Sequence, residues 1–289
     1  MEEELANQLK TNRPNISNST VKTYISILRT IYKKLDGKDG IKFFENEKRK
    51  IIDDILKIEN NQTIKTKLSA LFVLTGDDDY HKPMLEFANK VNANYKEQKT
   101  DKKRAENLPT IDELKQIYDN AKTALLKNKS IDNFITYFVV ALTSGVIMPP
   151  RRSLDYCEMK IRNFNKTEDN YIDKDNFIFN KFKTSKFVKQ EDKIVKIPTE
   201  ILKFIKQFKK ISDNDYLLYN VKTDRPYNAS TFSKLLNRIF GKNISVDALR
   251  SIYLTNLYGG LPPIKQLEQT AQEMGHSVSS ALNYYVKQN

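Results

Sequence analysis

Apolar residues recur at helical spacing along almost the whole sequence, and they alternate only between Tyr171 and Pro198. Apolar residues three and four positions apart mark the buried face of a helix, whereas alternation marks a half-buried strand. A chain with one short alternating region can build only a small sheet. The pattern therefore predicts a mainly α fold that contains a small antiparallel sheet.

The first hundred residues predict a small helical bundle. Residues 1–17 are polar, and we expect them to be a flexible N-terminus. An amphipathic helix then runs from Asn18, a residue type that caps helices, to Asp36-Gly37. Amphipathic segments follow at about 47–58, 63–75 and 82–96, and their apolar stripes can close a bundle. The first helix has a basic side formed by Lys22, Arg29, Lys33 and Lys34.

A polar segment at 97–107 divides the chain. It has no apolar period and resembles an exposed linker. At 289 residues the chain is long enough for two domains, each with its own core. We therefore expect a helical domain over 18–98, a linker over 99–107 and a second domain over 108–289.

The second domain is predicted to be α+β. Thr110 and Glu113 form a capping box that begins a helix, and the helix at 130–143 is so apolar that it should be the buried centre. Two strands, 176–182 and 193–198, are joined by a segment rich in lysine, as in a hairpin with a basic tip. Further helices are expected at about 199–210 and 229–240.

The last forty-five residues carry an unusual group of polar side chains. Ser245 can cap a helix that places Arg250 in its first turns. Glycine and proline pairs at 259–263 break this helix. After a further helical segment, a Gly-His turn at His276 leads into a last short helix that carries Tyr284 and Tyr285.

The charge of the chain favours a polyanionic partner. Its 49 Lys and Arg against 36 Asp and Glu give a net charge of +13, which suits phosphate neutralisation, although a solvated basic surface is the simpler alternative. No apolar run is long enough to span a bilayer, and the N-terminus is acidic where a signal peptide is basic. We expect an intracellular protein with no membrane partner.

Cysteine and histidine are too few for a disulfide or a Cys/His metal cluster. The chain has one cysteine, Cys157, and two histidines, His81 and His276. Its chemistry is therefore expected to need no transition metal and no cofactor.

Five residues in a fixed order resemble the catalytic domain of the tyrosine recombinases, the integrase family of DNA strand-transfer enzymes. They are Arg152 with Asp155 three residues on, Lys183 in the hairpin turn, Arg250, His276 and, nine residues later, Tyr285. The helical bundle is similar to the core-binding domain of this family, so the resemblance spans about 18–289. The Pro-Pro-Arg-Arg sequence at 149–152 most resembles the corresponding sequence in recombinases of large DNA viruses, virophages and Polinton-type elements.

The resemblance implies a two-domain clamp on duplex DNA. Members of the family break and rejoin DNA at specific sites through a 3′-phosphotyrosine bond, without a metal, as dimers or tetramers on DNA. The protein would be associated with DNA in a viral factory of the host cytoplasm, the nucleus or the bacterial cytoplasm, which the sequence does not distinguish.

The residue types suit phosphodiester chemistry. Arg152 and Arg250 offer forked, permanently charged donors to the non-bridging oxygens, where negative charge concentrates during in-line attack. By resemblance, Tyr285 is the nucleophile and Lys183 the acid that protonates the leaving 5′ oxygen. His276 would donate a hydrogen bond to the phosphate or orient the tyrosine, and Asp155 would support Arg152 without touching DNA.

Several assignments have alternatives. Arg151 could be the phosphate ligand in place of Arg152, Lys181 or Lys186 could replace Lys183, and Tyr284 could be the nucleophile instead of Tyr285. Arg250 could also be a surface arginine and His276 a helix cap.

One position departs from the family pattern. Asp247 stands three residues before Arg250, where the family usually has His or Lys. This departure is the argument for an inactive DNA-binding relative. A type IB topoisomerase also stays open, because that class of enzyme shares the Arg-Lys-Arg-His-Tyr chemistry.

Overall fold

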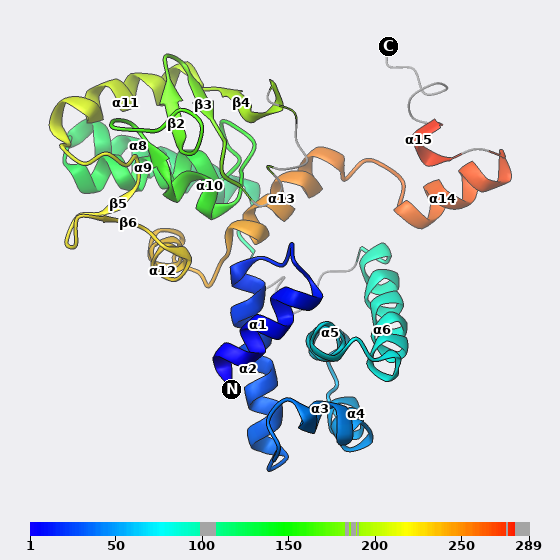
Figure 1. Cartoon of the computed structure of the whole chain (residues 1–289). Helices are drawn as coiled ribbons and strands as arrows, with labels where there is room; N and C mark the ends of the chain where they lie inside the picture. Colours follow the sequence, from blue (N-terminus) through cyan, green and yellow to red (C-terminus); the bar gives the residue numbers. More distant parts are fainter. Residues whose placement is uncertain (99–107, 183–184, 186–188, 190, 276, 281–289) are drawn as a thin grey trace. The chain divides into compact units, whose positions relative to one another are not determined.

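Contacts in the computed structural model divide the chain into two units. The first comprises Met1–Lys99 and the segment that begins at Pro262, and the second comprises Thr100–Leu261. The structure describes residues 1–98, 108–182, 185, 189, 191–275 and 277–280. Figure 1 shows a mainly helical chain whose second unit contains a small sheet and a separate pair of short strands, which confirms the predicted fold class. The clamp arrangement stays a prediction.

The first unit is a bundle built on α5 (Asn61–Thr75), a helix with buried residues along most of its length. The Asn60 side chain accepts a hydrogen bond from Thr63 N at the start of α5, and Gly76 ends it in the left-handed conformation at φ 72°. The helices around α5 are α2 (Asn18–Lys34), α3 (Lys42–Asn46), α4 (Lys48–Leu56) and α6 (Asp78–Lys96).

The expectation of a flexible N-terminus is wrong for α1 (Glu2–Asn12). Leu5 and Leu9 lie one helical turn apart and are both fully buried in the core of the first unit. The Asn12 side chain donates to the carbonyl oxygens of Val73 and Leu74 at 3.0 and 2.7 Å, which ties the end of α1 to α5. Two buried leucines and one amide thus tie an otherwise polar segment to the bundle.

The segment after residue 261 also belongs to the first unit. It contains α14 (Ile264–Glu273) and α15 (Val278–Ser280). Lys96 Nζ pairs with Glu268 at 2.9 Å, and Ile264 N donates to Gln98 Oε1 at 2.9 Å. The sequence predicts that residues 108–289 form one domain, whereas these contacts group the segment from Pro262 with the end of α6. Grouping by contacts does not test where a domain ends, so the predicted domain limits stay a prediction.

The second unit is organised around α9 (Ile131–Thr143), as its apolar composition predicts. Every residue of α9 from Tyr137 to Thr143 is buried. Helix α8 (Ile111–Lys127) begins with the predicted capping box, in which Glu113 N donates to Thr110 Oγ1 and Thr110 N donates to Glu113 Oε2. The other helices are α10 (Ser153–Cys157), α11 (Thr199–Ile211), α12 (Ala229–Phe240) and α13 (Val246–Tyr258).

The sheet of the second unit has the strand order β1-β2-β3-β4. Its hairpin pairs Phe177 with Val195, so the predicted antiparallel strands are confirmed, although they are shorter than expected. The pairing of β1 with β2 is parallel, which the sequence does not predict. The strands are β1 (Met159–Lys160), β2 (Asn170–Asp173), β3 (Asn176–Ile178) and β4 (Ile194–Lys196), and a separate pair joins β5 (Tyr219–Asn220) to β6 (Arg225–Pro226).

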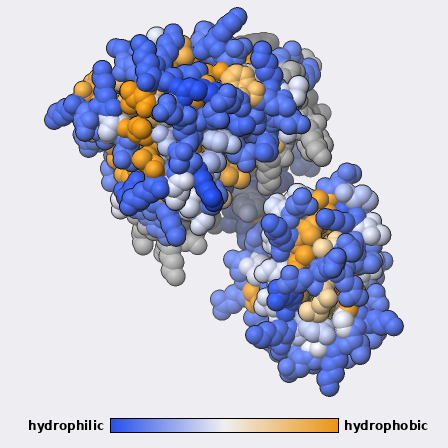
Figure 2. Space-filling view, turned by 60° about the vertical axis from the view of Figure 1, so that its left-hand side comes forward, coloured by the Kyte–Doolittle hydropathy of each residue, from blue (hydrophilic) through white to orange (hydrophobic). Residues whose placement is uncertain are grey.

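Most of the surface in the view of Figure 2 is hydrophilic, and its hydrophobic side chains lie in small groups. Across the described residues, every helix is too short or too polar to cross a bilayer.

Leu9→Ala tests whether α1 is part of the bundle. Leu9 is fully buried, so removing its side chain should lower the free energy of unfolding by about 2–5 kcal/mol. Asn7→Ala changes an exposed position of the same helix and should stay within about 0.5 kcal/mol of the unmodified protein. Urea unfolding of the full chain measures both changes. Equal stabilities for the two variants would mean that α1 does not pack on the bundle.

Candidate functional site

The predicted arginine pair lies in the turn that leads into α10. Arg151 Nε donates to Asp155 Oδ2 at 3.1 Å, and the Asp155 side chain is only 4 % exposed. The Arg151 guanidinium also lies 4.0 Å from the ring centroid of Phe179 and 5.1 Å from that of Phe182. A carboxylate and two aromatic rings thus hold this arginine in place.

The ion pair of Asp155 differs from the one predicted. The sequence pairs Asp155 with Arg152, but the carboxylate bonds Arg151 instead. The reason is local, because α10 begins at Ser153, Arg152 occupies the N-cap position, and Arg151 folds back over the first turn. Within the described residues Arg152 forms no ion pair, and its side chain is half-buried. Of the two arginines, Arg152 is therefore the one that is available to an added anion.

A third arginine acts on the same carboxyl. Burial raises the pKa of Asp155, and the positive charges of Arg151, Arg152 and Arg250 oppose that rise. Arg250 comes from α13, almost a hundred residues after the arginine turn, so the fold brings together two of the site residues that the sequence predicts. The positive charges of all three arginines therefore act on one buried carboxyl, which suits an anionic ligand near it.

Asp247 is the hydrogen-bonded partner of Arg250. Arg250 Nη1 donates to Asp247 Oδ1 at 3.0 Å, with the Arg250 side chain 31 % exposed and that of Asp247 75 % exposed. The Ser245 side chain caps α13 by accepting from Ala248 N, as predicted, and this cap fixes the turn that carries both residues. An exposed carboxylate thus competes with any phosphate for Arg250.

Gly145 positions α13. It has a left-handed φ of 79°, and a Cβ atom built on it would lie 2.8 Å from Cδ2 of Tyr253. Tyr253 is three residues after Arg250 on the same helix, so this close contact sets the distance between α13 and the loop that leads to the arginine turn. Only glycine accommodates both the backbone angle and the ring.

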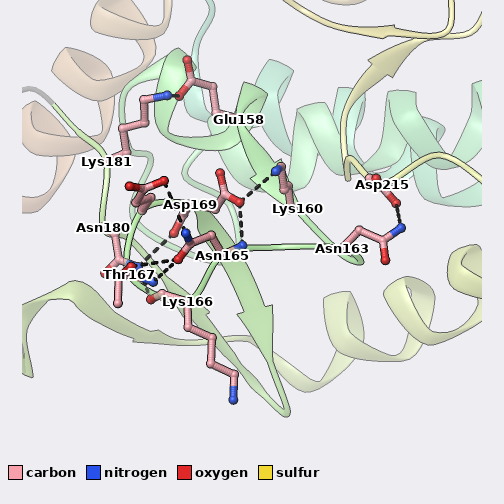
Figure 3. Close-up of polar contacts among 11 residues, drawn as sticks. Glu158, Lys160, Asn163, Asn165, Lys166, Thr167, Asp169, Asn180, Lys181 and Asp215 are labelled. Atoms are coloured by element: carbon pink, nitrogen blue, oxygen red, sulfur yellow. Dashed lines mark hydrogen bonds and ion pairs between the residues drawn. The ribbon is translucent and has the colours of Figure 1, made fainter.

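Polar side chains fix the segment that leaves β3 toward the predicted catalytic lysine. Lys181 Nζ pairs with Glu158 Oε2 at 3.0 Å, and the Asn180 amide donates to the carbonyl oxygens of Lys166 and Asp169 (Figure 3). The carboxylate of Asp169 binds Lys160 Nζ and the backbone N of Asn165, each at 2.8 Å. Lys181, an alternate for the catalytic lysine, is thus already paired with a carboxylate.

Five of the predicted residues lie outside the described part of the chain. They are Lys183, Lys186, His276, Tyr284 and Tyr285. Their assignments therefore stay predictions.

The basic side of α2 is partly neutralised. Arg29 contacts Glu2 of α1, and Lys34 Nζ donates to Asp54 Oδ1 at 2.6 Å. Lys22 and Lys33 line a surface groove beside α2. Arg29 and its partner Glu2 line the same groove, so part of its positive charge is balanced.

A second basic groove lies on the second unit, beside α12. Lys222, Lys234 and Arg238 line it together with Asp132 and Tyr227. Its positive charges come from α12 and from the turn between β5 and β6, which the sequence does not predict to be a hairpin. No set of three or more His, Cys, Asp or Glu side chains in the described residues is arranged to hold a metal.

Sequence reasoning did not single out Asn170 or the rings of Phe179 and Phe182. Asn170 is the first residue of β2, and its side chain is fully buried. An amide at a buried strand position was the available signal, because such a group must find hydrogen-bond partners.

Comparisons with known proteins do not assign the chain to a family. No protein-family model matches it, and no curated protein sequence matches it. Among solved structures, the crystal structure of XerA recombinase is similar at a TM-score of 0.33 and 18 % identity, over 99 % of this chain and 94 % of that one. A likeness at this level is too low to show a family.

Gly145→Ala tests how α13 is positioned. The left-handed backbone and the contact with Tyr253 should together lower the free energy of unfolding by about 2–4 kcal/mol. Gly260→Ala is the matched control, because a Cβ atom there meets nothing within 4 Å. Thermal and urea unfolding measure both variants, and an equal effect of the two would show that Gly145 does not constrain α13.

Proposed function

We propose that this chain is a DNA strand-transfer enzyme of the tyrosine recombinase kind, which cleaves and rejoins duplex DNA through a 3′-phosphotyrosine intermediate. One observation supports the proposal most directly. Arg152 and Arg250, which are far apart in sequence, act on one buried carboxyl together with Arg151. Such a cluster of guanidinium groups matches the charge of a scissile phosphate.

The roles of the arginines follow from their partners. Arg151 is engaged by Asp155 and two rings, so it acts as a support, and Arg152 is the phosphate ligand of the pair. Arg250 binds the second non-bridging oxygen once a phosphate displaces Asp247. Guanidinium groups held before the DNA arrives need little reorganisation when charge develops in the transition state.

The strand transfer uses residues that are assigned from the sequence. The oxygen of Tyr285 forms a bond to phosphorus, and the bond from phosphorus to the 5′ oxygen breaks. The tyrosine gives up its proton to a base, and the leaving oxygen takes a proton from the ammonium group of Lys183. His276 donates a hydrogen bond to the phosphate. Atoms and charges balance without a cofactor, and the reverse sequence rejoins the strand.

DNA binding draws on both units. The net charge of +13 favours a polyanion, and the grooves beside α2 and α12 offer lysine and arginine side chains to the phosphate backbone. Exchange of strands between two duplexes needs more than one active site, so we expect a dimer or tetramer on DNA.

Tyr285→Phe tests the enzyme class. The substrate is a pool of nicked duplexes with a randomised central sequence. After cleavage the short strand dissociates, so the strand cannot be rejoined and a protein–DNA adduct is trapped. The unmodified chain should form an adduct that survives denaturant in the presence of EDTA. Tyr285→Phe lacks the attacking oxygen and should form none, while Tyr284→Phe should form it normally. Denaturing gels measure the adduct, and filter binding measures the affinity for DNA, which should not change.

The outcomes separate the alternatives. Adduct formation by Tyr285→Phe but not by Tyr284→Phe would move the nucleophile by one residue and keep the enzyme class. No adduct with the unmodified chain would overturn the proposed function and leave a DNA-binding protein. Relaxation of a supercoiled plasmid by a monomer would favour a topoisomerase instead.

Asp247→Asn tests the competition for Arg250. Loss of this carboxylate frees the guanidinium for a phosphate, so DNA affinity should rise by up to about fivefold at low salt, as is typical for an exposed ion pair. The slope of log affinity against log salt should steepen by about one, because one more phosphate is neutralised. Asp173→Asn removes the same charge from an exposed strand position and is the matched control. An equal rise in DNA affinity for both variants would mean that the rise comes from the change in net charge and not from Arg250.

A further inference from the structure

Asn170 links the arginine turn to the segment that carries the lysines. Its Nδ2 donates to Asp155 O at 3.1 Å and to Lys181 O at 2.8 Å, and its Oδ1 accepts from Lys181 N at 2.7 Å. The side chain is fully buried, and these three bonds use both of its donors. One amide therefore holds two backbone segments that the proposed reaction needs in a fixed relation.

The geometry explains why an asparagine does this. Strand β3 ends at Ile178, and beyond it Phe179 N donates to Lys193 O at 2.9 Å, the last backbone bond between these two segments in the described part of the chain. At Lys181 the side-chain amide of Asn170 donates and accepts as a peptide group of an adjacent strand does. Its remaining N–H bonds the carbonyl of Asp155, whose carboxylate holds Arg151.

We infer that Asn170 is a positioning residue, which fixes the start of the lysine-bearing segment against the arginine turn through the backbone of Lys181. The inference rests on the proposed function, because the lysine matters only if a leaving oxygen must be protonated. Lys183 follows Lys181 by two residues in the sequence. The clamp at Lys181 thus fixes the backbone from which the lysine-bearing segment continues. Asn170 itself touches no substrate.

The clamp predicts a defect in proton delivery rather than in DNA binding. Asn170→Asp keeps the shape of the side chain but places an oxygen against the carbonyl oxygens of Asp155 and Lys181, where the amide donated. Cleavage of saturating nicked duplex in a single turnover should slow by about 100-fold, the range of a lost general acid. The affinity for DNA should stay within about threefold of that of the unmodified chain.

A substrate with sulfur in place of the bridging 5′ oxygen separates positioning from a general structural role. A thiolate leaves without a proton, because a thiol is far more acidic than an alcohol. If Asn170 acts through the lysine, Asn170→Asp should cleave this substrate within about threefold of the rate of the unmodified chain. An equal slowing on both substrates, or no slowing on the ordinary one, would overturn the inference.

Asn133→Asp is the matched control. The Asn133 amide also donates to two carbonyl oxygens, those of Ala124 and Asn128, but it lies at the start of α9 and bonds neither Asp155 nor Lys181. Its cleavage rate should stay within about threefold of that of the unmodified chain on both substrates. If Asn133→Asp slows cleavage as much as Asn170→Asp does, the position of Asn170 has no special role and the inference fails.

Two further measurements keep the test decisive. Asn170→Ser has a smaller, uncharged side chain that cannot span the Asp155 and Lys181 carbonyls. It takes the place of Asn170→Asp if that variant does not fold, and the same slowing and the same rescue by sulfur are expected. Hydrogen exchange at the Lys181 amide reports the clamp without DNA, and exchange should be faster in Asn170→Ser. Failure of the proposed function appears as an unmodified chain that forms no adduct at all, whereas failure of this inference appears as Asn170 variants that cleave normally or are not rescued.

Discussion

The ion pair between Asp155 and Arg151 is the contact on which the rest of the candidate site depends. A buried carboxylate without a partner costs several kcal/mol, so the cation must stay beside it. The same residue bonds Asn170 through its carbonyl, and its carboxyl lies within the electrostatic reach of Arg152 and Arg250. One aspartate therefore connects the arginine turn, the sheet and α13.

Periodicity predicted the elements whose stability comes from one continuous apolar face. Helix α9 and the β3–β4 hairpin belong to this group, and both formed where alternation or helical spacing placed them. Helix α1 was missed because only Leu5 and Leu9 reach the core, and two residues make no period. The β5–β6 pair has two residues in each strand, which is too short for any alternation to appear. Tertiary packing, rather than local pattern, decides such segments.

The sequence could identify the residue types of the candidate site but not their pairing. Whether Asp155 bonds Arg151 or Arg152 depends on the residue at which α10 begins, and helix ends are poorly determined by sequence. The approach of Arg250 depends on Gly145, whose left-handed backbone admits the ring of Tyr253. The role of Asn170 could not be recognised from a sequence motif. Its partners are backbone atoms of residues 155 and 181, and every residue type has the same backbone groups.

The charges of the cluster suggest why two carboxylates accompany three arginines. Arg151, Arg152 and Arg250 with Asp155 and Asp247 leave one net positive formal charge, which equals in magnitude the charge of one phosphodiester. Three unopposed guanidinium groups would repel one another and would bind any polyanion strongly. The two carboxylates differ in burial, however. Asp155 is enclosed and keeps Arg151 in place, whereas Asp247 is exposed and can yield Arg250 to a phosphate at little desolvation cost. The cluster thus combines a fixed support with an exchangeable partner, which the proposed binding and release of one phosphate would require.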